Sequence, residues 1–282
     1  MGKPKFYDFC VHTVPDGENS FQEMATLARY FGYSGIAVAN HSDKLFQSKA
    51  AAPKPQKTPE AGSKNTEDLK SPGNQFKIES AIEPKIKPKT ESEPEITAES
   101  GFDIFKGIEL VEENPSKLQG LIGKFRKTVD VLIVHGGSEN INRAALENPR
   151  VDILNHPAFE KSSGLNQVLA KTAAENNVAI GLSLRPILHS RGSRRIHLLS
   201  DLRVNLDLAR KYDVPFILLS DAMSCFDLRA PMEALAVAEV CGLEEAEALG
   251  AISTVPEKIL AKNRPGPGHI REGIEVIEED CF

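Results

Sequence analysis

Six residues with side chains of the metal-binding type lie at or just after the ends of predicted strands of this chain, and they are spread over most of its 282 residues. Imidazole nitrogens and carboxylate oxygens hold divalent ions, and an ion held in this way can activate water for attack on a phosphoester. Any one of the six could instead be a core or rim residue with a satisfied hydrogen bond. Their recurrence at strand ends points to a common site. The six residues are His12, His41, Glu109, His135, His156 and Asp221.

The elements that must position these residues are short apolar stretches that alternate with helical patterns. This alternation predicts parallel strands joined by right-handed crossovers. The expected strands are Phe6–His12, Ile36–Ala39, Asp103–Leu110, Val129–Val134, Val151–Leu154, Ala179–Leu184 and Pro215–Leu219. An open doubly wound sheet and a barrel are both compatible with this set. Polar residues after nearly every strand favour a TIM-like α/β barrel, because the carboxyl-terminal rim of a barrel gathers them.

Helical spacing of apolar residues, with capping residues at several ends, predicts the connecting helices. The expected helices are Phe21–Phe31, Pro115–Lys127, Glu139–Glu147, Leu165–Asn177, Ile196–Tyr212, Pro231–Val240, Glu244–Ile252 and Pro256–Lys262.

The composition changes in residues 45–101, which contain nine Lys, nine acidic residues and seven Pro but no Arg. Such a polar segment buries too little apolar surface to become ordered, so we predict a disordered insertion, with a short helix near Lys64–Leu69 as an option. The domain prediction is a single barrel, residues 1–264, interrupted by this insertion. Residues 265–282 are expected to form a flexible acidic tail.

Charge and cysteine content limit the possible functions. The net charge of −6 and the pI near 5.7 argue against a free-standing nucleic-acid-binding protein, so any RNA contact must use a local patch. The four cysteines have no paired spacing, which is typical of a reduced, cytoplasmic protein. The sequence has neither a signal peptide nor an apolar run long enough to cross a membrane, so no membrane association is expected.

A local basic patch follows the strand Ala179–Leu184. We expect a loop there, and then a helix with two of its arginines at the amino terminus, where the helix dipole helps to bind an anion. Guanidinium groups bind phosphate through two parallel hydrogen bonds, so this patch is a candidate RNA contact. The alternative is a solvated loop that pairs with acidic neighbours, and His189 in it could either contact RNA or be solvated. The five arginines are Arg185, Arg191, Arg194, Arg195 and Arg203.

The run Asp227-Leu228-Arg229-Ala230-Pro231 is either functional or purely structural, and the structural interpretation assigns a contact to each of two residues. Asp227 is expected to cap the turn before the next helix. Arg229 is expected to pair with Asp221 or Asp8 inside the ring of strand-end residues, where a guanidinium would replace a metal ion.

The strand-end residues resemble the ligand set of the polymerase and histidinol phosphatase (PHP) family of metal-dependent phosphoesterases. His41, Glu109, His135 and His156 match the family motifs in order. Two motifs differ, because Cys10-Val11-His12 lacks its leading His and Asp221-Ala222-Met223 lacks its final His. The resemblance therefore implies a PHP-type barrel with a degenerate site that holds at most one Zn-like or other divalent ion, requires no cofactor and has no catalytic residues.

A second resemblance covers the chain except for the insertion and the tail. The run from Val214 through Ser220-Asp221-Ala222 to Asp227–Pro231 is its strongest part, and Phe6–Asp8, Phe31–Ala37 and Gly181–Ser183 add to it. These residues resemble the archaeal ribonuclease P subunit family, which is related to the thirty-kilodalton subunit of the eukaryotic enzyme. The resemblance implies a non-catalytic subunit of the endonuclease that removes the 5′ leader of precursor tRNA. It also implies three partners: ribonuclease P RNA, a small ferredoxin-like protein subunit and other protein subunits.

Three functions thus remain open. The first is the ribonuclease P subunit, and the broken motifs at Cys10 and Met223 favour it. The second is a PHP-type phosphoesterase, which hydrolysis of a chromogenic phosphoester with added metal would reveal. The third is a binding module that uses residues 45–101 as an arm.

Overall fold

The computed structural model describes residues 4–44, 101–158, 162–264, 269–271 and 274–275. The predicted insertion, apart from Gly101, and the optional helix near Lys64–Leu69 lie outside these residues.

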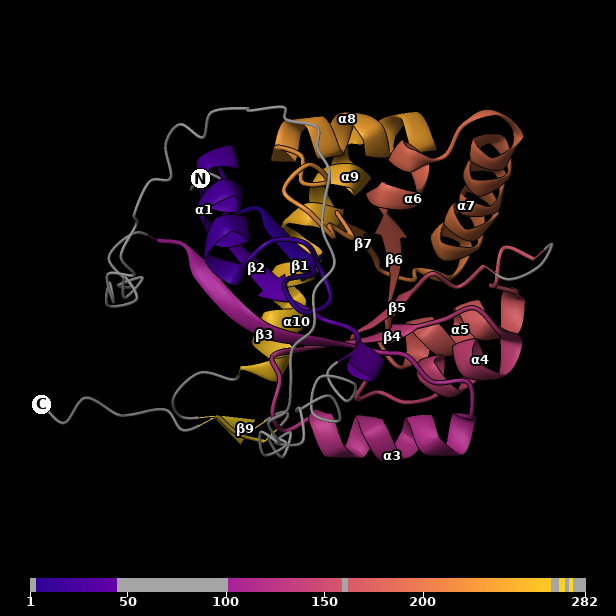
Figure 1. Ribbon diagram of the computed structural model, residues 1–282. Helices are drawn as coiled ribbons and strands as arrows, with labels where there is room; N and C mark the ends of the chain where they lie inside the picture. Colours follow the sequence, from indigo (N-terminus) through magenta and orange to yellow (C-terminus); the bar gives the residue numbers. More distant parts are fainter. Residues whose placement is uncertain (1–3, 45–100, 159–161, 265–268, 272–273, 276–282) are drawn as a thin grey trace, which may run out of the picture.

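Seven strands in the described residues form one sheet, and every neighbouring pair in it is parallel (Figure 1). They follow one another around the sheet in sequence order, and the first strand meets the residues just after the last strand at a bridge between Val11 and Ala222. The backbone N–H of His12 donates to the carbonyl of Ala222 over 2.8 Å at this junction, which closes the sheet into a ring. The predicted barrel is therefore confirmed over the open sheet. The strands are β1 (Tyr7–Val11), β2 (Gly35–Val38), β3 (Asp103–Leu110), β4 (Val131–His135), β5 (Ile153–Asn155), β6 (Ala179–Ser183) and β7 (Phe216–Leu219).

Helices surround the ring, and most of them match the predicted ranges within a few residues (Figure 1). The first shows why the prediction worked, because Ser20 and Glu23 form a capping box and Gly32 ends the helix in the left-handed conformation. The helices are α1 (Phe21–Phe31), α3 (Pro115–Phe125), α4 (Glu139–Leu146), α5 (Gln167–Glu175), α6 (Leu184–His189), α7 (Gly192–Tyr212), α8 (Pro231–Cys241), α9 (Glu245–Ile252) and α10 (Thr254–Asn263).

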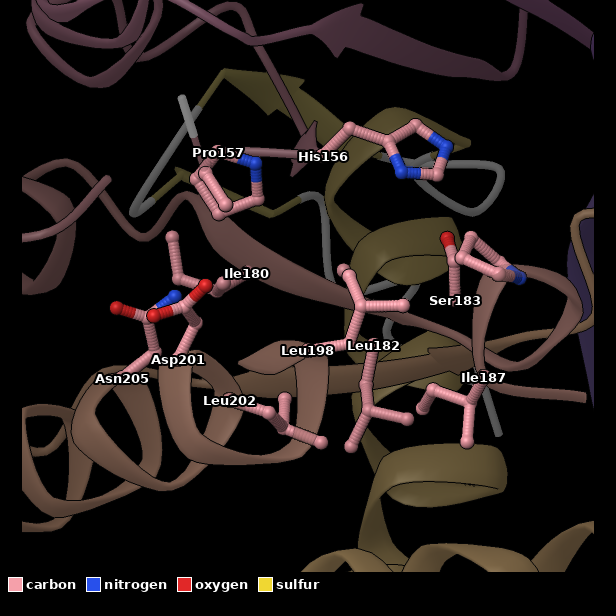
Figure 2. Close-up of a pocket in the computed structure, with 13 residues that line it drawn as sticks. His156, Pro157, Ile180, Leu182, Ser183, Ile187, Leu198, Asp201, Leu202 and Asn205 are labelled. Carbon is pink, nitrogen blue, oxygen red and sulfur yellow. The ribbon is translucent and has the colours of Figure 1, made fainter. Parts of the chain in front are cut away.

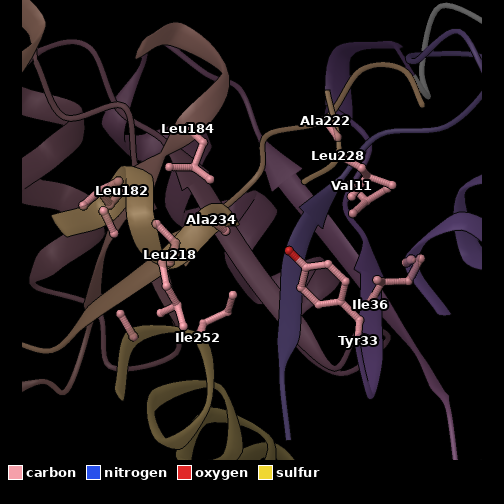
Figure 3. Close-up of a cluster of buried hydrophobic side chains, with 14 of the residues drawn as sticks. Val11, Tyr33, Ile36, Leu182, Leu184, Leu218, Ala222, Leu228, Ala234 and Ile252 are labelled. Atoms are coloured by element: carbon pink, nitrogen blue, oxygen red, sulfur yellow. The ribbon is translucent and has the colours of Figure 1, made fainter. Parts of the chain in front are cut away.

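The core has an inner part and two outer parts. Inside the ring, the aromatic rings of Tyr7, Phe9 and Phe105 pack at centroid distances of 5.8–6.1 Å, and Ile259 of α10 belongs to the same cluster. Outside the ring, one cluster joins the strands to α1, α8 and α9 (Figure 3), and the other joins them to α3, α4 and α5. The strands therefore make apolar contacts on both faces of the sheet. Burial on both faces explains why the sequences of the strands are almost continuously apolar.

The structure corrects the predicted loop after β6. Residues 184–189 form α6, and α7 begins at Gly192 rather than at Ile196. Pro186 lies in the first turn of α6, where a missing N–H costs nothing because that group has no partner inside the helix. The arginines thus lie on two helices and at the junction between them.

A short antiparallel ribbon, β8 (His269–Arg271) with β9 (Ile274–Glu275), lies within the segment that the sequence assigns to a tail. The flexible acidic tail itself stays a prediction. No helix among the described residues is both long enough and apolar enough to span a bilayer.

Candidate functional site

The six predicted strand-end residues lie together at the carboxyl-terminal mouth of the barrel, although they come from six different strands or the loops that follow them. His12 and His41 have stacked rings with centroids 4.6 Å apart. The rings of His41 and His135 are 5.6 Å apart, and those of His135 and His156 are 4.7 Å apart. The imidazoles thus line one side of the mouth, around two carboxylates, Glu109 and Asp221.

Glu109 is the fully buried centre of this cluster. Its Oε1 accepts hydrogen bonds from His135 Nδ1 over 2.9 Å and from Asn155 Nδ2 over 3.3 Å. Its Oε2 lies 3.7 Å from His12 Nε2 and 3.6 Å from His41 Nε2. Burial alone would raise the pKa of Glu109, but the hydrogen bond from His135 and the nearby imidazoles hold that pKa below its usual value. Glu109 is therefore an ionised carboxylate in an apolar barrel.

Asp221 is the second carboxylate, and it faces two histidines. Its Oδ1 lies 3.4 Å from His12 Nε2, and its Oδ2 lies 3.3 Å from His156 Nε2. Both Asp221 and His156 have positive φ, 56° and 47°, a conformation that costs energy for residues other than glycine. Burial opposes ionisation of Asp221, but the hydrogen bonds from both histidines outweigh it and keep the pKa of Asp221 low. The two residues with positive φ thus place the Asp221 carboxylate and the His156 imidazole 3.3 Å apart.

Asp16 belongs to the site, and the sequence did not identify it. Its Oδ2 accepts from His41 Nδ1 over 2.8 Å and from the His41 backbone N–H over 2.8 Å, and it lies 3.1 Å from His12 Nδ1. The available signal was its place in the turn Pro15-Asp16-Gly17, directly after the first strand. A carboxylate that accepts from one ring nitrogen leaves the other free to bind a metal ion, so Asp16 orients both histidines.

Cys10 stands where the family motif has its leading His, and its thiol contacts three members of the cluster. The Sγ atom is 3.5 Å from His12 Nε2, 3.5 Å from Glu109 Oε2 and 3.8 Å from Asp221 Oδ1. With the 3.4 and 3.7 Å separations from His12 to the carboxylates, five of the six separations among these four donor atoms are 3.4–3.8 Å, and all four atoms lie within 4.8 Å of one another. Zinc bonds of about 2.0–2.3 Å require ligand separations of roughly 3.3–3.8 Å in a tetrahedral site. The donor set therefore fits one zinc ion.

Asn155 links this cluster to the run Gly181-Leu182-Ser183. Its side-chain N–H₂ donates to Glu109, and its Oδ1 accepts from Ser183 Oγ over 2.7 Å. A Cβ at position 181 would lie 2.8 Å from Asn155 Oδ1, so glycine is required for the amide to reach Glu109. Gly181 and Ser183 thus help to hold Asn155 in place, and Asn155 in turn donates to the buried carboxylate of Glu109.

The predicted basic patch divides into two parts. Arg185 lies on α6, where its Nε is 3.4 Å from Asp227 Oδ2, so pairing with an acidic neighbour describes this arginine. Arg191, at the start of α7, and Arg194 and Arg195 within it lie in a run, residues 191–197, in which every residue is exposed. Within residues 4–44, 101–158 and 162–264, no ion pair involves these three arginines. The exposed end of α7 thus carries cations that can meet an external anion.

A cavity of about 90 Å³ lies beneath α7, between that helix, α6 and β6 (Figure 2). Leu198 and Leu202 of α7 face Leu182 and Ile187 across it (Figure 2). Asn205 lies at one end and donates its side-chain N–H to the carbonyl of Ser163 over 2.8 Å. The cavity thus lies on the barrel side of α7, opposite the exposed run of residues 191–197.

The expectation for Arg229 is wrong, and the one for Asp227 is confirmed. Arg229 Nη1 donates to the carbonyls of Phe226 and Leu228 over 2.7 and 2.8 Å, because Asp221 is already satisfied by two imidazoles. Asp227 caps the turn by accepting from the backbone N–H groups of Met223 and Ser224 over 3.1 Å each.

His189 reaches the same carboxylate. Its Nε2 lies 2.6 Å from Asp227 Oδ1. His189 therefore ties α6 to the loop after β7.

Asp8 leads to a testable pH dependence. Its Oδ1 accepts from the backbone N–H groups of Cys10 and Ser220, but its Oδ2 has no partner in the described residues. Burial raises the pKa of Asp8 from 3.8 to about 6. The folded state thus holds the proton more tightly than the unfolded state, so the free energy of unfolding falls as pH rises from about 4 to about 6.

We expect Asp8→Asn to stabilise the protein by about 3 kcal/mol at pH 8, since each pKa unit corresponds to about 1.4 kcal/mol, and to have little effect at pH 4. Urea unfolding at both pH values measures this difference. An equal effect at pH 4 and pH 8 would contradict the role given to Asp8.

The chain matches a known protein family in its sequence and in its fold. A family model described as RNase P subunit p30 matches residues 5–265. The chain is 64% identical to ribonuclease P protein component 3 of Methanosarcina mazei and 65% identical to that of Methanosarcina acetivorans, with 100% of both chains covered in each case. It also resembles a chain in the cryo-EM structure of archaeal ribonuclease P with mature tRNA. That match has a TM-score of 0.66 and 23% identity, and it covers 97% of this chain and 100% of the other.

Proposed function

Because the chain belongs to the RNase P subunit p30 family, we propose that it is a protein subunit of ribonuclease P, the endonuclease that removes the 5′ leader of precursor tRNA. The match of the family over residues 5–265, which span the whole barrel, carries this proposal. Its partners are ribonuclease P RNA, a small ferredoxin-like protein subunit, other protein subunits and precursor tRNA, and its place of action is the cytoplasm.

In this role the chain contributes binding surface, and the RNA component carries out the catalysis. The exposed amino-terminal end of α7 supports an RNA contact, because Arg191, Arg194 and Arg195 lie there without an acidic partner among the described residues. A chain of net charge −6 needs such a local patch to approach a polyanion. Arg203 lies further along α7, and Arg185, held near Asp227, marks the side of the patch closest to the barrel mouth.

The barrel mouth is proposed to bind a single zinc-like ion through Cys10, His12, Glu109 and Asp221. The donor separations of 3.4–3.8 Å support this set, and a thiolate favours zinc over manganese or magnesium. His41, His135 and His156 contact the ligand carboxylates or Asp16 and so belong to the supporting hydrogen-bond network. When bound, the ion would supply cross-links between β1, β3 and the loop after β7, and no hydrolytic role is assigned to it.

The convergence of four histidines also keeps the phosphoesterase alternative open to test. A phosphoesterase of the PHP type needs several ions, and here one fully buried thiol takes a ligand position suited to a single soft ion. We expect no release of chromophore from a chromogenic phosphoester with added Mn²⁺ or Zn²⁺. Turnover by the purified chain that is lost in the His41→Ala variant would support the alternative.

Reconstitution tests the main proposal. Ribonuclease P is assembled from its RNA and its other protein subunits, with and without this chain, and cleavage of precursor tRNA is measured. We expect the chain alone to cleave nothing, and the complete assembly to cleave faster than the assembly that lacks it. Equal rates at several salt concentrations, with and without the chain, would contradict a role as a subunit.

A further inference from the structure

Helix α8, at the top of Figure 1, carries an apolar row on its exposed side. Its inner side is buried through residues such as Ala234 and Ala238. On the outer side, Met232 and Val240 are 69% and 71% exposed, and Ala236 between them is exposed as well. Residues four apart lie on the same side of a helix, so these three form one row. A helix that is apolar on its inner and outer sides is typical of one that is covered on both.

The loop that leads into α8 adds a large aromatic side chain. Phe226 is 87% exposed, although the loop around it is held in place. Asp227 accepts from the backbone N–H groups of Met223 and Ser224, and Arg229 Nη1 donates to the carbonyl of Phe226 over 2.7 Å. An aromatic ring on a fixed loop loses little conformational freedom when a partner covers it. Aromatic side chains of this kind are common anchors of protein interfaces.

The charges around the apolar row are all acidic. Residues 230–257 contain six Glu and no Lys, Arg or His, and their charge equals the net charge of the whole chain, −6. At about 100° for each residue of a helix, Glu233 and Glu239 lie at the two edges of the row. Both are exposed, and so are Glu244 and Glu245 at the start of α9. We define the α8 face as Phe226, Met232, Glu233, Ala236, Glu239 and Val240.

These charges identify the kind of molecule that suits the α8 face. RNA is repelled by an acidic rim. A two-fold dimer places the same surface of both copies in contact, so the glutamates of one copy would meet those of the other. Like charges brought together in this way destabilise an interface. A different protein, with an apolar centre and a rim of Lys and Arg, complements both the row and its edges.

We propose that the α8 face binds a basic protein subunit of the ribonuclease P assembly. Apolar side chains of that subunit cover Phe226 and the row on α8, and its cations pair with Glu233 and Glu239. The inference rests on the proposed function and adds to it a division of surfaces. The basic end of α7 contacts RNA, and the α8 face contacts protein.

Binding of single subunits tests the apolar part of the face. The other protein subunits of the assembly are purified one by one, and the affinity of each for the full chain is measured by calorimetry without RNA. We expect one basic subunit to bind, and we expect Phe226→Ala and Val240→Ser each to weaken its binding by about 10-fold or more. Val168→Ser makes the matched change at a 64% exposed valine of α5 and should leave the affinity unchanged. Circular dichroism verifies that each variant is folded.

Salt dependence tests the acidic rim. Glu239→Lys should weaken the same complex and flatten the dependence of its affinity on salt, because a pair of opposite charges becomes a pair of like charges. Glu113→Lys changes the net charge by the same amount at an exposed site beyond β3, and it should alter neither property.

Three results would overturn the α8 face as a protein-binding surface. The first is that no subunit binds the wild-type chain, or that Phe226→Ala and Glu239→Lys bind as tightly as wild type. The second is self-association of the chain alone that Phe226→Ala abolishes, which would assign the face to a second copy. The third is weaker binding of either variant to ribonuclease P RNA without other proteins, which would assign the face to RNA. Faster cleavage of precursor tRNA in the presence of the wild-type chain would, in each case, leave the proposed function standing.

Discussion

Replacing Glu109 by alanine is expected to abolish zinc binding and to lower the free energy of unfolding by about 3–5 kcal/mol. Glu109 is fully buried, and His135 and Asn155 both donate to it. Its removal leaves these donors without an acceptor and leaves the imidazole of His12 with one carboxylate fewer. The loss exceeds that of an ordinary cavity because a charged group at the centre of a network is removed.

The measurement combines metal content after purification without chelators with urea unfolding. We expect about one zinc ion for each wild-type chain and none for Glu109→Ala. Cys10→Ser is the more conservative change, since it keeps the volume and exchanges the soft sulfur donor for a poor ligand. It should weaken zinc binding by at least about 10-fold with a smaller loss of stability. Glu113→Ala, an exposed carboxylate just beyond β3, is the control and should change neither property.

Two outcomes would contradict this account of the barrel mouth. Full zinc content in Glu109→Ala would place the ion at other residues. Two or three ions in the wild-type protein would instead support the phosphoesterase alternative, because a cluster of that size needs His41, His135 and His156 as direct ligands.

The sequence predicted the barrel and the convergence of its strand-end residues because both depend on local patterns. In β4, for example, the four residues before His135 are all apolar. The apolar residues of the helices between the strands recur at helical spacing. Once the strands are parallel, their carboxyl-terminal ends must lie at one mouth, so His12 and Asp221 meet although they are far apart in the chain. This step requires topology only, without any knowledge of side-chain contacts.

The sequence did not predict the roles of Asp16 and Cys10, because these depend on loop geometry and on the packing inside the ring. Asp16 reaches two histidines only because its turn folds back over the mouth. Cys10 reads as a missing histidine in the motif, whereas its distance to both carboxylates makes it a potential ligand. Arg229 is the opposite case. Its charge suggested a carboxylate partner, whereas its guanidinium donates to backbone carbonyls.

Replacing both Arg194 and Arg195 by alanine is expected to weaken binding to ribonuclease P RNA by about 10- to 100-fold near physiological salt. It should also reduce the slope of log affinity against log salt by up to about one unit for each phosphate contact that is lost. Both residues are exposed on α7, and no ion pair within residues 162–264 engages them, so their removal should leave the fold unchanged.

Titration of the assembly at several salt concentrations separates an RNA contact from a structural effect. Arg29→Ala with Lys117→Ala removes the same charge from α1 and α3, and it controls for the change in net charge. If α7 meets the RNA backbone, only the α7 variant should flatten the salt dependence, because counterion release depends on contacts rather than on total charge. Equal slopes for the two variants would instead mean that α7 acts only through the overall field of the protein, and the five arginines would lose their assignment as an RNA-binding surface.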